Sequence, residues 1–79
     1  EIKHIVLIFS SVSFVDTTAL DAFEAMQLKL QEASILLHLA EVKGPVMDQL
    51  EQTPFIEQLK PGQVFFTTDD AFKQLTTSP

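Results

Sequence analysis

The segment Ile5-Val6-Leu7-Ile8-Phe9, followed closely by Phe14-Val15-Asp16-Thr17-Thr18-Ala19-Leu20, decides the fold class of this chain. The first run is apolar without alternation and rich in β-branched residues. It predicts a strand over Ile2 to Phe9 that is buried on both faces of a parallel sheet. The second run contains Asp16-Thr17-Thr18, three side chains that accept hydrogen bonds from the free amides at a helix start. A strand that leads directly into a helix is typical of an α/β protein.

The alternation of strands and helices continues along the chain. Apolar residues at spacings of three and four predict a helix over about Thr18 to Glu32. Thr18 and Asp21 have the spacing of a capping box, and Gln27 and Gln31 fall on the solvated side. The further elements expected are a strand over Ile35 to Ala40, a helix over Pro45 to Gln52, a helical turn at Phe55 to Leu59, a strand over Val64 to Phe66, and a helix after Thr67 that buries Ala71, Phe72 and Leu75.

The order strand, helix, strand, helix, strand, helix predicts a βαβαβα fold with parallel strands and right-handed crossovers. We expect the helices to lie mainly on one face of the sheet. Since the strands lack polar alternation, the other face needs cover as well. We therefore expect residues 1–79 to form a single domain that is incomplete at its N-terminus, where a further strand or hairpin is missing.

Length and composition exclude several classes of protein. With 79 residues the chain forms one domain at most, and the absence of Cys excludes disulfides and the usual structural zinc sites. The net charge is −6 and all five basic residues are Lys, none adjacent to another, which argues against nucleic acid as a partner. The longest apolar run, Ile5 to Phe9, is far shorter than the roughly 20 residues that cross a bilayer. Most of the seven Phe are expected in the core, with partial exposure of Phe55 and of Phe65 or Phe66.

Enzymatic chemistry has little support in the sequence. His4 and His38 fall within predicted strands and are far apart, so both are interpreted as structural. Gly44 and Gly62 are isolated and form no phosphate-binding loop. A small enzyme that uses Asp16 and Thr17 would lack a base. We therefore predict no catalytic residue, no metal and no cofactor.

Two helix starts are the candidate functional sites. Asp16, Thr17 and Thr18 are either simple helix caps or a phosphorylated, partner-binding switch, because a phosphoryl group there would change the charge of the helix start. Lys43, Gly44 and Pro45 open the next predicted helix, and are a candidate contact for an anion or a partner.

The quoted segments resemble the core signature of STAS domains (sulfate transporter and anti-sigma factor antagonist). In that family an Asp, two Ser or Thr residues and a small residue open a helix, as Asp16 to Ala19 do here. The stretches Leu39 to Leu50 and Val64 to Ala71 are similar to the second half of STAS domains in bacterial SulP-type anion permeases. The resemblance covers Ile2 to Leu75. In anti-sigma factor antagonists the residue after the Asp is phosphorylated, and it matches Thr17.

The resemblance implies a non-enzymatic, regulatory domain that acts through protein contacts. It would be the cytoplasmic C-terminal domain of a SulP-type sulfate or related anion transporter, at the inner face of the plasma membrane. Its partners would be the transporter membrane domain, a soluble regulatory protein or a second copy, and it would meet the membrane only through the transporter. The alternative is a free-standing cytoplasmic anti-sigma factor antagonist or stress-signalling protein that phosphorylation switches. The reading frame upstream of Glu1 distinguishes the two.

Overall fold

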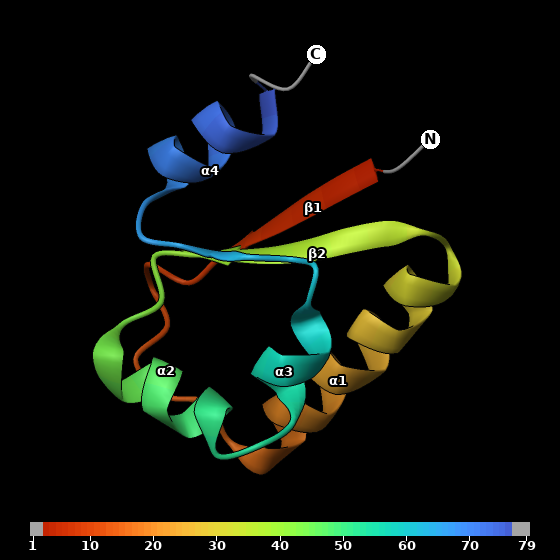
Figure 1. The fold of residues 1–79 in the computed structure, drawn as a ribbon. Helices are drawn as coiled ribbons and strands as arrows, with labels where there is room; N and C mark the ends of the chain where they lie inside the picture. The colour runs from red at the N-terminus through yellow and green to blue at the C-terminus, as the bar shows by residue number, and fades with distance from the viewer. Residues whose placement is uncertain (1–2, 77–79) are drawn as a thin grey trace.

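Within residues 3–76 the fold consists of three parallel strands and four helices, in the order that the sequence predicts (Figure 1). A computed structural model describes residues 3–76 of the chain. The elements are β1 (Lys3–Ile8), α1 (Thr17–Glu32), β2 (Ile35–Ala40), α2 (Gly44–Glu51), α3 (Phe55–Leu59), β3 (Val64–Phe65) and α4 (Thr68–Thr76). The predicted α/β class and the βαβαβα order are confirmed, and the expected helical turn is α3.

β2 is the centre of the sheet, whose order is β1-β2-β3. It pairs with β1 along its whole length, from Lys3 opposite Ile35 to Ile8 opposite Ala40. It pairs with β3 only at its end, where Leu39 and Ala40 lie opposite Val64 and Phe65. The first half of β2 therefore has no strand neighbour on the β3 side in the described part of the chain.

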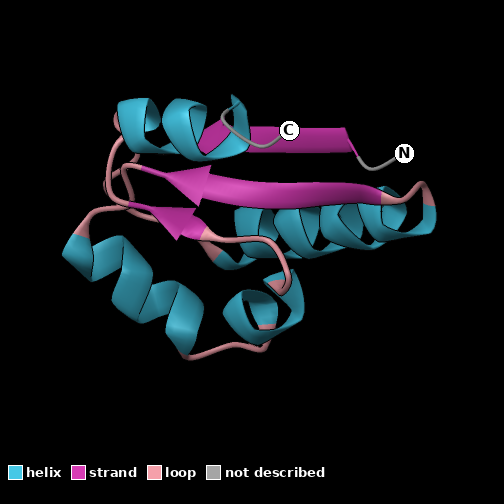
Figure 2. Ribbon diagram, turned by 45° about the horizontal axis from the view of Figure 1, so that its top comes forward, coloured by secondary structure: helices cyan, strands magenta, loops and turns pink. Residues whose placement is uncertain are grey.

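The helices lie in two layers, with α1, α2 and α3 on one face of the sheet and α4 on the other (Figure 2). Side chains of a strand alternate between faces, so Leu37 and Leu39 point to the three-helix layer while His38 and Ala40 point to the α4 side. Most helices share one face, as predicted. The separate position of α4 follows from its contacts with β1 and β3.

Two apolar clusters hold these layers together. The larger joins β2 to α2 and α3 and includes Phe9, Val15, Leu37, Leu39, Val46, Leu50, Phe55 and Leu59, all under 8% exposed. Burying a single Leu or Phe side chain contributes roughly 1.5–3 kcal/mol, so this cluster is the main source of stability. The smaller cluster lies under α4 and consists of Ala40, Phe65 and Ala71.

β1 is less buried than its apolar sequence predicts. It lies at the edge of the sheet, and Ile5 and Ile8 are 38% and 51% exposed. The prediction of a strand buried on both faces is therefore wrong for β1, and holds instead for the second half of β2, whose last four residues are buried. An unbroken apolar run indicates that a strand belongs to a sheet covered on both faces, but it does not show which neighbouring strands and helices cover it. The expected N-terminal covering element stays a prediction.

The aromatic residues also depart from the predicted core. Phe72 is 67% exposed, because the neighbouring Ala71 occupies the side of α4 that meets the sheet. Phe14 and Phe66 are 70% and 89% exposed, whereas Phe55, for which we expect partial exposure, is fully buried. Phe55 opens α3, and its ring lies 6.3 Å from that of Phe23 on α1, so the contact is between elements that are distant in sequence.

Two glutamines that are predicted to be solvated connect α1 to α3. Gln27 is 3% exposed, and its Nε2 donates to the Phe55 carbonyl at 3.4 Å. The Nε2 of Gln31 donates to the Gln58 carbonyl at 2.9 Å. The apolar spacing in α1 identifies only the side of the helix that packs against the sheet. α3 packs against a second side of α1, which this spacing does not indicate. The solvated position predicted for Gln27 is therefore wrong.

Candidate functional site

Asp16 is the N-cap of α1. Its backbone is extended, with φ −86° and ψ 172°, and its Oδ1 accepts a 2.8 Å hydrogen bond from the Ala19 amide. This bond satisfies one of the helix-start donors that otherwise lack a partner. Thr17 is the first helical residue, so the capping box predicted between Thr18 and Asp21 is wrong, and the cap lies two residues earlier, at Asp16. Thr17 and Thr18 are both exposed.

Gln49 of α2 fixes the loop that presents this helix start. Its Oε1 accepts from the Val15 amide at 3.0 Å, and its Nε2 donates to the Val15 carbonyl at 2.9 Å. One side-chain amide thus pairs with both polar groups of a backbone residue, as a neighbouring strand would. Gln49 belongs to no motif. Its one signal in the sequence is its position next to the buried Leu50, on a short helix whose other polar residues are solvated.

A hollow of about 240 Å³ lies beside the Asp16 cap. Val15, Asp16, Thr17 and Leu20 line one side of it, and the end of α2 with the residues that follow it lines the other. The hydroxyl-bearing Thr17 therefore stands at a concave surface between two helices. A group from a partner that enters this hollow would contact the cap and Thr17 together.

The second predicted site, Lys43-Gly44-Pro45, opens α2 and is exposed throughout. Lys43 is the N-cap by its backbone only, since its side chain makes no capping bond. The Met47 amide donates to the Lys43 carbonyl at 2.8 Å. The structure does not bring Lys43-Gly44-Pro45 together with Asp16. Asp16 lies beside the C-terminal end of α2, and a helix of eight residues is about 12 Å long.

A further polar contact joins the end of β2 to α4. The Glu41 carboxylate accepts hydrogen bonds from the hydroxyl of Thr68, at 2.5 Å, and from its amide, at 3.1 Å. These two bonds, the hydroxyl first, lower the pKa of Glu41. Glu41 has a positive φ of 59°, an uncommon conformation for a residue with a Cβ. The hydroxyl of Thr67, the residue before Thr68, accepts from the Asp70 amide at 3.0 Å and confirms the helix start expected there.

His4 and His38 bond to each other across the sheet. His38 is 1% exposed, and its Nδ1 accepts a 3.0 Å hydrogen bond from the Gln63 amide. The proton of a neutral His38 must therefore be on Nε2, which donates to His4 Nδ1 at 2.9 Å. Burial first, and the neighbouring His4 second, lower the pKa of His38. The two rings thus bond to each other between β1 and β2, and His38 also bonds to Gln63, the residue before β3.

Residues 3–76 contain neither a group of metal-ligating side chains nor a membrane-spanning helix. In that part of the chain no three His, Asp or Glu side chains are grouped as metal ligands. No helix there is long and apolar enough to cross a bilayer.

The parallel sheet and the Asp-capped Thr-Thr start of α1 agree with the STAS class of domains. The STAS domain family matches this chain over residues 1–75, and the chain belongs to that family. Its relatives include the probable sulfate transporter 3.4 of Arabidopsis thaliana, 30% identical over 77 residues, and the high affinity sulfate transporter 2 of Stylosanthes hamata, 31% identical over 71 residues. These matches cover 98% and 90% of this chain but only 12% and 11% of the two transporters.

A solved structure shows the same fold. The sulfate transporter family protein of Wolinella succinogenes superimposes with a TM-score of 0.83 and 27% sequence identity. The match covers 92% of this chain and 62% of the Wolinella chain. The chain is therefore a STAS domain, similar in sequence to short parts of sulfate transporters and in fold to this solved protein.

Proposed function

We propose that this chain is a regulatory, protein-binding domain on the cytoplasmic side of a SulP-type anion transporter. The observation that carries the proposal is the exposed helix start Asp16-Thr17-Thr18 beside a hollow, held in place by the two hydrogen bonds of Gln49. The similarity of the chain to sulfate transporters supports its assignment to a transporter. The chain spans about an eighth of their length, so transport itself would belong to the rest of such a protein.

Thr17 is suited to act as a switch because of what surrounds it. A phosphoryl group on the first helical residue meets the positive end of the α1 dipole, which favours the added charge. The same group lies next to the carboxylate of Asp16, and fills part of the hollow that a partner would use. Phosphorylation would therefore change the surface that the site presents more than the fold of the helix.

The proposed mode of action is binding without catalysis or a cofactor. A nucleophilic Thr17 would need a base, and the two histidines of the chain bond to each other on the sheet. The proposed partners are the membrane domain of the transporter, a soluble regulatory protein or a second copy of the domain. The exposed start of α2 at Lys43-Gly44-Pro45 offers such a partner a second contact, about one helix length from Asp16.

Transport by the full-length protein tests the proposal. Thr17→Glu mimics the added charge, and Gln74→Glu adds the same charge to an exposed position on α4 as a matched control. We expect Thr17→Glu to change anion uptake severalfold in cells that lack their own transporter, at unchanged protein level, while Gln74→Glu has no effect. Equal uptake by the Thr17→Glu variant and the wild type would contradict a regulatory role for the helix start.

Further measurements distinguish a regulatory site from a simple helix cap, and a transporter domain from a free-standing signalling protein. If Thr17→Glu lowers uptake and thermal stability together, Asp16 and Thr17 serve only to cap the helix. Mass spectrometry of the protein from its own cells tests phosphorylation of Thr17 directly. An upstream reading frame without apolar helices would instead favour the free-standing signalling protein.

A further inference from the structure

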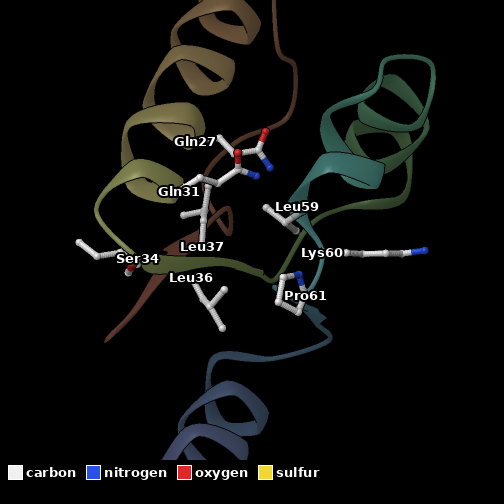
Figure 3. A pocket seen from close by; sticks show the side chains of 9 residues that line it. Gln27, Gln31, Ser34, Leu36, Leu37, Leu59, Lys60 and Pro61 are labelled. Atoms are coloured by element: carbon white, nitrogen blue, oxygen red, sulfur yellow. The ribbon is translucent and has the colours of Figure 1, made fainter. Parts of the chain in front are cut away.

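A cavity of about 390 Å³ opens at the other end of α1, where β2 begins and α3 ends (Figure 3). Its walls come from three elements that are distant in sequence. The last turns of α1 contribute Gln27 and Gln31, β2 contributes Ile35 and Leu37, and the end of α3 contributes Leu59. Known sites for small molecules have volumes of about 300–1,000 Å³ and mostly apolar walls, and this cavity agrees with both.

The edge of β2 inside the cavity lacks its usual ladder partner. The Leu39 amide donates to the Gln63 carbonyl at 2.9 Å, and by strand alternation the Leu37 amide points to the same edge. β3 pairs only with Leu39 and Ala40, so among the described residues no ladder bond reaches the Leu37 amide. Leu37 is only 3% exposed, and a buried donor without an acceptor gains from one that a ligand brings.

Two side-chain amides add polar groups to the apolar wall. Gln27 is buried, and its one hydrogen bond, to the Phe55 carbonyl, is long at 3.4 Å. Gln31 uses one amide hydrogen for the Gln58 carbonyl. Each side chain keeps a second N–H and an oxygen, and Figure 3 shows both amides directed across the cavity toward α3. The wall can thus both donate and accept.

The charge around the cavity favours an uncharged ligand over an ionic one. No carboxylate lines it. The one cation at its rim, Lys60, extends away from the cavity in Figure 3, and its Nζ lies 3.5 Å from Glu57 Oε2. A cation that entered would lose its hydration without gaining a carboxylate, and an anion would meet only Lys60, which points away and pairs with Glu57.

We propose that this cavity binds a small uncharged molecule with an apolar body and one amide or carbonyl group. The apolar body lies between Leu59 and Ile35, and the carbonyl accepts from the Leu37 amide while Gln27 bonds the same polar group. The walls are preformed, because the Gln31 bond and the close packing of Gly62 against the Leu37 carbonyl hold α1, α3 and β2 in position. This site is independent of the helix start at Asp16.

The test is a titration of the ¹⁵N-labelled chain with acetanilide, which carries an aromatic ring and an amide. n-Butylbenzene, of the same number of heavy atoms but without a polar group, and benzoate, which is charged, are the comparison probes. We expect acetanilide to produce saturable shifts of the Leu37 amide and the Gln27 side-chain amide, with a dissociation constant of about 1 mM. Butylbenzene should bind several times more weakly, and benzoate should leave these signals unchanged.

A matched pair of variants tests the role of the buried amide. Gln27→Leu should weaken acetanilide binding roughly fivefold to tenfold and leave butylbenzene binding unweakened, while Gln74→Leu on the exposed side of α4 should change neither. Spectra of both variants show whether the fold is kept. Shifts that do not saturate, equal binding of acetanilide and butylbenzene, or a folded Gln27→Leu variant with wild-type affinity for acetanilide would each overturn the proposal.

Discussion

Gly62 lies in the tightest backbone contact of the fold, and its replacement by Ala tests the packing of β3 on β2. A Cβ at this position would lie 1.9 Å from the Leu37 carbonyl oxygen and 2.8 Å from that of Leu59. Real Cβ atoms essentially never approach closer than 3.0 Å, so the chain would have to move by about 1 Å. Both obstacles are backbone atoms of packed elements, and neither can turn aside as a flexible side chain would.

The expected cost follows from what such a movement breaks. Gln63, the next residue, accepts from the Leu39 amide at 2.9 Å and donates to His38 Nδ1 at 3.0 Å. Each bond contributes about 1 kcal/mol, and a buried group left without its partner costs about 1–3 kcal/mol. We expect Gly62→Ala to lower the free energy of unfolding by about 3 kcal/mol, out of about 4–12 kcal/mol for a chain of this size. The corresponding fall in melting temperature is about 12–24 °C.

Urea unfolding followed by circular dichroism measures this loss, and Gly44→Ala is the matched control. A Cβ at Gly44, the first residue of α2, meets nothing within 4 Å. There we expect unchanged or slightly higher stability, by about 0.5 kcal/mol, because Ala loses less backbone freedom on folding. If Gly62→Ala and Gly44→Ala unfold at the same urea concentration, the close approach of Gly62 to β2 is wrong.

Three further predictions concern caps and titrating groups. Asp16→Ala should lower the free energy of unfolding by about 1 kcal/mol, whereas Asp16→Asn should keep most of it, measured by urea unfolding. Burial lowers the pKa of His38 in the folded state below its ordinary value of 6.5. The buried neutral form therefore contributes its full stabilisation above pH 6.5, and this contribution is lost as the pH falls through the pKa of the folded state. Urea midpoints between about pH 8 and pH 5 should therefore decline toward the acid side, and decline less in His38→Gln. The hydroxyl and amide of Thr68 lower the pKa of Glu41 in the folded state. The ionised carboxylate therefore stabilises the fold above the usual glutamate pKa, and this stabilisation is lost as the pH falls through the pKa of the folded state. Glu41→Gln should be less stable than the wild type near neutral pH and lose less stability on acidification, and an identical acid profile for both proteins would contradict the contact.

Elements that the local sequence defines were predicted to within one residue at the two ends of β2 and at the start of α1. β2 begins and ends where predicted, because polar residues flank its apolar run on both sides. α1 begins one residue earlier than expected, since Asp16 rather than Thr18 caps it. In both cases the deciding interactions lie within one turn of the chain, where spacing and side-chain chemistry are sufficient.

Features that depend on distant neighbours were not predictable in this way. Gln27 has the spacing of a solvated residue, and only the position of α3 buries it. Phe72 has the spacing of a core residue, yet the side of α4 that meets the sheet is the one that carries Ala71. At the candidate site, the Asp16 motif could be recognised, whereas its support by Gln49 bridges 34 positions and has no local signal.

Glutamine bonds to the backbone explain how so small a chain without Cys presents a rigid helix start. Gln27, Gln31 and Gln49 each bond a backbone carbonyl of another segment, across 28, 27 and 34 positions of sequence. The first two attach α1 to α3, and the third attaches the loop before α1 to α2. Both ends of α1 are thus held by neighbours other than the sheet. Under the proposed function, a modification at Thr17 would meet a backbone held on both sides, so it would change partner binding more than local unfolding.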